Sequence, residues 1–161
     1  MRMSLKAVLD EREIDPVLAG VCGIYCGTCE VYRAWVAQDR ERLLEIAGAR
    51  GVPVDRVLCT GCRMPGNFCF VGACPIRSCA ESKGLAFCAD CPEFPCAKIE
   101  RAVEVAPGRV AVVQNGSRIR AIGWYAWLRE QDARWRCPAC HAKVAARDAA
   151  CRTCGTVLGI P

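Results

Sequence analysis

Two Cys-x-x-Cys pairs near the end of the chain constrain its fold more than any other feature. Cys137-Pro-Ala-Cys140 is followed after ten residues by Cys151-Arg-Thr-Cys154-Gly155. Zinc prefers four ligands in a tetrahedron, and each Cys-x-x-Cys turn presents two sulfur atoms to such a site. Gly155 permits the turn after the second pair, and the short spacing requires a tight hairpin. The sequence therefore predicts a rubredoxin-like, four-cysteine zinc ribbon over residues 135–161.

The first pair also matches the attachment motif of c-type haem, because His141 follows Cys140 directly. Haem of that type is attached after export, and an export signal is not evident in this sequence. Haem would also leave the second pair without a role. We therefore interpret His141, the one histidine of the chain, as a surface residue of the ribbon.

The redox state of the thiols decides how the cysteines are used. Residues 1–18 contain no apolar run of signal-peptide length and no small-residue cleavage site. No stretch approaches the roughly 18 consecutive apolar residues of a membrane span. We therefore expect a cytoplasmic protein without a membrane segment, in which reduced thiols serve as metal ligands rather than disulfides. The odd number of cysteines, 15 in all, agrees with this expectation.

The formal net charge of +5 overstates how basic the protein is. A zinc ion held by four thiolates carries about −2, so three such sites would bring the total to about −1. The charge is also uneven, because residues 1–108 hold 13 basic and 14 acidic side chains while residues 109–161 hold 9 and 3. Only the C-terminal third is basic.

Eleven cysteines precede residue 100 as one triad, two clear pairs and several single positions. Two four-cysteine sites need eight thiols, so about three would be left, and spare cysteines are commonly buried as small apolar side chains. With the C-terminal site this gives at most three sites, and we expect two to three zinc ions. The predicted metal ligands are Cys22, Cys26, Cys29, Cys59, Cys62, Cys74, Cys79, Cys88, Cys91 and Cys96 in the body, and Cys137, Cys140, Cys151 and Cys154 in the ribbon.

Several cysteine spacings occur together in the body. They are Cys22-Gly-x-Tyr-Cys26-Gly-x-Cys29-x-x-Tyr32, Cys59-x-Gly61-Cys62, Pro75-Ile76-Arg77-x-Cys79-Ala80-x-x-Lys83-Gly84 and Cys88-x-x-Cys91-x-Glu93-Phe94-Pro95-Cys96. In this combination, residues 20–100 resemble a cysteine-rich bacterial and archaeal family of unknown function that is generally treated as zinc-binding. Some of its members carry a C-terminal zinc ribbon. The resemblance implies metal binding and a cytosolic location, and it implies no reaction. Cys69 fits the pattern least well and is left out of the predicted ligands.

Iron–sulfur ligation is the alternative for the N-terminal domain. Cys22-x3-Cys26-x2-Cys29 has the spacing of the cluster-binding triad of radical S-adenosylmethionine enzymes, but the chain is too short for their barrel and shows no alternation of strands and helices. A simple [4Fe–4S] cluster remains an alternative, because cysteine followed by proline occurs in ferredoxins. The same dipeptide also occurs in zinc turns.

The pattern predicts a small, metal-stabilised α+β protein with an irregular cysteine-rich body. Apolar spacing predicts helices over 31–49, 97–105 and 115–134, with Thr28 as a helix cap and a second helix starting near Asp39. Residues 5–18 are expected to form a short helix or arm that ends before Pro16. The last helix is apolar around most of its circumference, so we expect it to lie between the body and the ribbon. The expected domains are 1–108 (cysteine-rich and metal-binding), 109–134 (linking helix) and 135–161 (ribbon).

A structural zinc protein that serves as a binding module explains this sequence best. An iron–sulfur protein for electron transfer or sensing is the alternative. An enzyme is disfavoured, because catalytic zinc usually has histidine or carboxylate ligands and only His141 could act as an imidazole base. We expect a protein partner. Nucleic acid is a second partner class, because nine basic residues and three tryptophans lie between 109 and 152.

Overall fold

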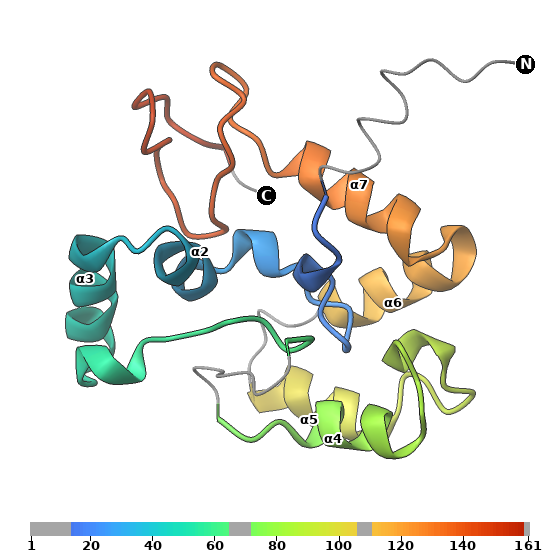
Figure 1. Cartoon of the computed structure of the whole chain (residues 1–161). Helices are drawn as coiled ribbons and strands as arrows, with labels where there is room; N and C mark the ends of the chain where they lie inside the picture. The colour runs from blue at the N-terminus through green and yellow to red at the C-terminus, as the bar shows by residue number, and fades with distance from the viewer. Residues whose placement is uncertain (1–13, 65–71, 106–110, 160–161) are drawn as a thin grey trace, which may run out of the picture.

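The computed structural model describes residues 14–64, 72–105 and 111–159, and these form a helix-rich molecule (Figure 1). None of the helices in these ranges has both the length and the apolarity needed to cross a membrane. The helices are α2 (Glu30–Val36), α3 (Arg40–Arg50), α4 (Pro75–Ser82), α5 (Ala97–Val105), α6 (Ala111–Ile122) and α7 (Trp124–Arg134). Four 3₁₀ turns accompany them: η1 (Pro16–Leu18), η2 (Cys26–Thr28), η3 (Val54–Arg56) and η4 (Cys88–Asp90).

The structure agrees with the prediction of a small protein with several short helices. It does not plainly belong to the predicted α+β class, because extended structure is sparse. In the described ranges, pairing between strands amounts to three isolated antiparallel bridges. One joins Ala19 to Tyr25, and two lie in the C-terminal segment. The many glycines, prolines and cysteines explain this, because each stretch between turns is too short to form a ladder. The short helix or arm expected over 5–18 lies largely outside the described residues.

Helices α2 and α3 form the N-terminal part of the body. As expected, Asp39 starts a second helix, and its carboxylate accepts the backbone N–H of Arg42 at 2.9 Å. Gly51 ends α3 in the left-handed region at φ 63°. The predicted Thr28 cap is wrong, because α2 is preceded by Cys29 and the Thr28 hydroxyl donates instead to the carbonyl of Tyr25.

The predicted single helix over 115–134 is also wrong. Two helices, α6 and α7, meet at Gly123, whose φ of 83° and ψ of 152° are compatible with glycine and with few other residues. The two helices pack against each other, and α6 begins before the predicted start. An isolated glycine in an otherwise helical pattern permits both a continuous helix and a break, so the pattern alone could not locate this corner.

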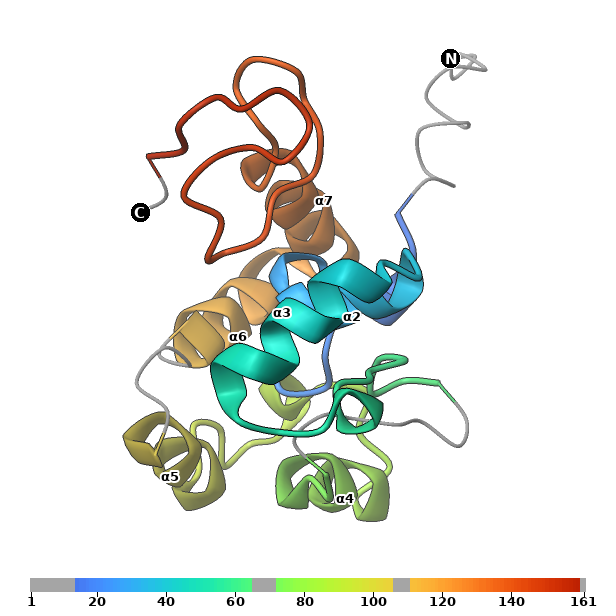
Figure 2. The same cartoon turned by 90° about the vertical axis from the view of Figure 1, so that its left-hand side faces the viewer.

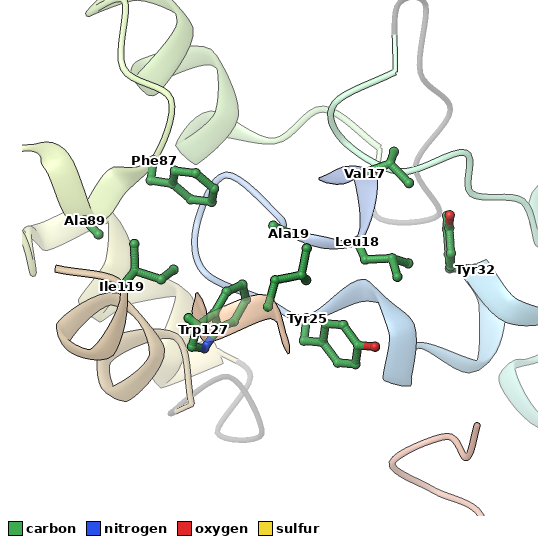
Figure 3. Packing of buried hydrophobic residues seen from close by; sticks show 10 residues of the cluster. Val17, Leu18, Ala19, Tyr25, Tyr32, Phe87, Ala89, Ile119 and Trp127 are labelled. Carbon is green, nitrogen blue, oxygen red and sulfur yellow. The ribbon is translucent and has the colours of Figure 1, made fainter. Parts of the chain in front are cut away.

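The core lies where the segment from Pro16 to Thr28 passes between α7 and the start of α2 (Figures 1 and 3). Trp127 and Leu128 of α7 are completely buried there. Tyr25 meets the Trp127 ring edge to face, with 6.5 Å between centroids. Around these residues the cluster also holds Val17, Leu18, Ala19, Tyr32, Phe87, Ala89 and Ile119. The circumferential burial expected for this part of the chain is wrong for α7, because Trp127 and Leu128 are buried while Trp124 and Ala126 of the same helix are exposed.

Helices α4 and α5 lie together on one side of the molecule, and the C-terminal segment lies on the opposite side, above α2 (Figure 2). Three apolar side chains of α2 and α3 are exposed, namely Trp35, Val36 and Leu44.

Candidate metal centres

The four cysteines near the C-terminus converge in space as predicted. The Sγ atoms of Cys137, Cys140, Cys151 and Cys154 all lie within 4.8 Å of one another. The Cys137–Cys154 and Cys140–Cys151 sulfur distances are each 3.6 Å. A metal ion with bonds of about 2.3 Å to sulfur, at the centre of a tetrahedron, needs sulfurs about 3.8 Å apart. This tetracysteine site therefore fits a single tetrahedral ion.

The two halves of the tetracysteine site have the same turn geometry. The backbone N–H of His141 donates to the carbonyl of Cys137 at 2.9 Å, and that of Gly155 donates to the carbonyl of Cys151 at 2.8 Å. Both His141 and Gly155 have positive φ angles, 58° and 74°. His141 thus occupies the position that glycine occupies in the second turn, and it is exposed. This position indicates that His141 serves the turn and is not a metal ligand.

Hydrogen bonds prepare part of the tetracysteine site for negative charge. The hydroxyl and backbone N–H of Thr156, followed by the contact with Cys140, lower the pKa of Cys154 to about 6. Backbone N–H groups of Cys154 and Thr153 lower the pKa of Cys151. The backbone N–H of Ala142 lowers the pKa of Cys140, but its sulfur neighbours, with Cys154 first, outweigh this and raise it to about 12. Four thiolates at this spacing repel one another, so their joint ionisation requires a bound cation.

A buried carboxylate joins the tetracysteine site to the body. Asp132 of α7 accepts the phenolic O–H of Tyr25 at 3.2 Å, and it pairs with Arg136 at 2.5 Å and Lys143 at 3.1 Å. Burial raises the pKa of Asp132, but the hydrogen bonds from Arg136 and Lys143 outweigh burial and lower it overall. Burial of Tyr25, followed by the negative charge of the same carboxylate, raises the pKa of that tyrosine.

A second set of contacts holds the C-terminal segment on α2. Arg33 donates to the carbonyl of Lys143 at 2.6 Å and to that of Gly27 at 3.3 Å. The backbone N–H of Ala146 donates to the carbonyl of Thr28 at 3.1 Å. The loop that carries the first cysteines of the body is thus hydrogen-bonded directly to the segment that carries the tetracysteine site.

The body cysteines fall into two groups, and the backbone of Val21 contacts both. The backbone N–H of Val21 donates to the Sγ of Cys62 at 3.4 Å, and its carbonyl accepts the backbone N–H of Cys88 at 2.9 Å. The first group packs on the core around Tyr25 and Tyr32, or lies beside it, and consists of Cys26, Cys29, Cys59 and Cys62. The second group lies around Cys88 and consists of Cys22, Cys74, Cys79, Cys88, Cys91 and Cys96. The sequence triad is therefore divided, because Cys22 belongs to the second group.

Four cysteines of the second group line one cavity of about 400 Å³, which we call the cysteine cavity: Cys79, Cys88, Cys91 and Cys96. Lys83 lies at its edge, with its ammonium group 3.6 Å from the Sγ of Cys91 and 2.7 Å from the carboxylate of Glu93. Burial, followed by the charges of neighbouring cysteines, raises the pKa of Cys88 to about 12.

The cysteine sulfurs lie closer together at the C-terminal site than in the body. Within 14–64, 72–105 and 111–159, the tetracysteine site is the one group in which three or more ligand atoms lie within 4.8 Å of one another. The ligand roles predicted for the ten body cysteines therefore stay predictions. Cys69 lies outside the described residues.

Sequence reasoning missed three polar residues that organise these sites. Arg120 of α6 donates to the carbonyls of Ala89, Cys91 and Phe94, and so fixes the loop of the cysteine cavity. Lys83 and Asp132 were missed as well. The sequence held a signal for Asp132, because the basic region 109–161 contains only three acidic residues. In the structure each of the three forms an ion pair. Nothing in the local sequence singled out Arg120.

Comparison with known proteins finds a family match in the body of the chain. A family model described as a protein of unknown function, DUF3795, matches residues 18–101, close to the range of the resemblance noted from the sequence. No curated protein and no solved structure matches the chain. The matched range contains both groups of body cysteines and ends before the tetracysteine site.

Proposed function

The chain belongs to the DUF3795 family of unknown function, and from its own residues we propose that it is a zinc-binding interaction module with structural four-cysteine sites. The observation that carries this proposal is the convergence of Cys137, Cys140, Cys151 and Cys154 within 4.8 Å. In the proposal these residues form a rubredoxin-like zinc ribbon. The sulfur spacing supports it, because it suits the bond lengths of a ZnS₄ site.

The proposed zinc is structural and not catalytic. Four protein thiolates saturate a tetrahedral ion, so no position remains for water or substrate. The neighbouring imidazole, His141, is exposed in a turn, where it has a backbone role. Because zinc would hold the two turns together, its binding free energy would be part of the folding free energy of this segment.

A second zinc ion is proposed for Cys26, Cys29, Cys59 and Cys62. They form two Cys-x-x-Cys pairs, the same ligand arrangement as at the C-terminus. Support comes from packing, because Cys26, Cys29 and Cys59 all contact the core around Tyr25. The N–H donated by Val21 to Cys62 is the kind of backbone contact that stabilises a metal-bound thiolate. This assignment gives two zinc ions per chain.

A cytoplasmic location is part of the proposal. None of the fourteen cysteines within the described ranges forms a disulfide. Reduced cysteines at this density suit a reducing compartment.

The partner of this module is proposed to be a protein. Most cations of the basic C-terminal third already bind groups of the same chain, which leaves few for phosphates. Examples are Arg118 with Glu130, Arg136 and Lys143 with Asp132, and Arg152 with Glu45. We expect no retention on random DNA or RNA at low salt, whereas binding with a steep salt dependence would favour nucleic acid.

Metal analysis of two paired variants tests the zinc proposal. Cys137→Ser with Cys154→Ser should release one zinc and unfold the C-terminal segment alone, with helical circular dichroism largely retained. Cys26→Ser with Cys62→Ser should release the other zinc. Wild-type protein without zinc, or loss of every metal ion in the first variant, would overturn the proposal.

A further inference from the structure

The cysteine cavity has ligands and space that the two proposed zinc ions do not use. Its four cysteines come from three neighbouring elements: Cys79 from α4, Cys88 and Cys91 from η4 and its end, and Cys96 from the residue before α5. From these residues we propose that the cavity binds a [4Fe–4S] cluster through Cys79, Cys88, Cys91 and Cys96. This proposal adds a centre to the zinc module and is independent of the zinc sites.

The space between the sulfurs separates this site from the tetracysteine site. At the tetracysteine site all four sulfurs lie within 4.8 Å of one another. The sulfurs of the cysteine cavity instead border a common space of about 400 Å³. In a [4Fe–4S] cluster each thiolate binds a different iron, so the four sulfurs stand farther apart than around one zinc ion. The cavity therefore suits a group with several metal atoms.

Apolar side chains form much of the cavity wall, as suits a redox cluster. Leu85 and Phe94 line it, and Phe94 is buried. Behind the loop, Gly116 of α6 lies so close to the ring of Phe94 that a Cβ would overlap with it. Arg120, one turn further along α6, binds three carbonyls of the same loop. Helix α6 thus holds Cys88 and Cys91 in place without contributing a ligand.

The charges around the cavity favour an anionic cluster. Four thiolates and an oxidised core of charge +2 give a total of about −2, which becomes more negative on reduction. Lys83 lies 3.6 Å from the Sγ of Cys91, and Lys98 also lines the cavity. A hydrogen bond from an ammonium group to a ligand sulfur stabilises the reduced state and raises the reduction potential. Glu93 binds Lys83 at 2.7 Å and so keeps the ammonium group beside the sulfur.

Anaerobic purification of the full chain tests this proposal, with iron, sulfide and zinc measured on the same sample. Before or after reconstitution with ferrous iron and sulfide, we expect about four iron and four sulfide per chain and a brown colour. Cys88→Ser and Cys91→Ser should each remove most of the iron and leave both zinc ions. As a control, Cys137→Ser with Cys154→Ser should lose zinc and retain iron, so the two proposals can fail separately.

A variant that keeps all ligands provides a test that does not depend on removing a cysteine. Lys83→Gln should bind iron normally and shift the reduction potential of the cluster to a lower value. Arg101→Gln is the matched control, because Arg101 lies on α5, pairs with Glu104 and does not line the cavity. The reduction potential of the cluster in this variant should equal that of the wild type. The proposal is overturned if reconstituted wild-type protein holds no more iron and sulfide than Cys88→Ser. It is also overturned if Cys88→Ser loses a third zinc ion instead.

Discussion

The phenolic oxygen of Tyr25 lies 3.2 Å from Oδ1 of Asp132, a residue 107 positions further along the chain. Tyr25 stands one residue before Cys26 of the first body group, and Asp132 pairs with Arg136 and Lys143, which flank the first Cys-x-x-Cys pair of the tetracysteine site. One buried hydrogen bond therefore connects the two cysteine-bearing parts of the molecule. Changes at either residue should weaken their docking.

Replacement of Tyr25 by phenylalanine should lower the free energy of unfolding by about 0.5–1.5 kcal/mol, the usual net contribution of a hydrogen bond. Asp132→Asn should cost more, because Arg136 and Lys143 then lose their carboxylate partner. Urea unfolding of the zinc-loaded protein measures both. Tyr32→Phe is the control, because Tyr32 is equally buried and its hydroxyl has no hydrogen-bond partner in the described ranges. An equal loss in the control would contradict the prediction.

The same pair predicts a pH dependence of stability on the alkaline side. Burial, followed by the negative charge of Asp132, raises the pKa of Tyr25 above its ordinary value of 10.0. The unfolded chain therefore releases the tyrosine proton before the folded chain does, and the stabilisation is complete below pH 10 and is lost as the pH rises further. Unfolding free energies measured across this range should fall more steeply for the wild type than for Tyr25→Phe. Parallel profiles would rule out the effect.

Two glycines inside helices should respond in opposite ways to alanine. A Cβ at Gly116 would overlap with the ring of Phe94, so Gly116→Ala should destabilise by about 1–3 kcal/mol despite its better helix propensity. Gly48 of α3 has nothing within 4 Å of its Cβ position, so Gly48→Ala should stabilise by about 0.5–1 kcal/mol. Thermal unfolding of the two variants compares them directly. A stabilising Gly116→Ala would show that α6 does not pack on Phe94 in this way.

Two neighbouring arginines of α6, Arg118 and Arg120, should differ in how much they stabilise the protein. Arg120→Met removes the hydrogen bonds to the carbonyls of Ala89, Cys91 and Phe94, and should cost about 1–2 kcal/mol. Arg118→Met removes only an exposed ion pair with Glu130 and should cost less than about 1 kcal/mol. Cys88 and Cys91 of metal-free protein should react faster with an alkylating reagent in Arg120→Met alone. Equal rates in the two variants would contradict a role for Arg120 in holding the loop.

Local signals in the sequence predicted local structure well. Helix α5 spans 97–105 as expected from its apolar spacing, and Asp39 starts α3 through its side-chain cap. The convergence of the C-terminal cysteines was predictable for the same reason, because each Cys-x-x-Cys pair determines its own turn and only one short hairpin has to bring the pairs together. Such features depend on interactions within a few residues.

Features that depend on distant contacts were not predictable. The corner at Gly123 is decided by the packing of α6 on α7, and a lone glycine permits either outcome. The spacing Cys22-x3-Cys26-x2-Cys29 favours a single site, yet Cys22 lies near Cys88, whereas Cys26 and Cys29 pack on the core around Tyr25. Sequence spacing cannot express this division, because the partners of Val21 are about 41 and 67 positions away in the chain.

By itself, the sequence determined that this chain carries cysteine pairs that could bind a metal ion, where some of its short helices and turns lie, and that four thiols near the C-terminus meet. Only the tertiary structure decided which body cysteines are neighbours, that four of them surround the cysteine cavity, and that Arg120, Lys83 and Asp132 support these sites. The physical reason is the range of the forces. Turns and caps are local, whereas a cavity and a buried ion pair arise from the packing of segments that are far apart in the sequence.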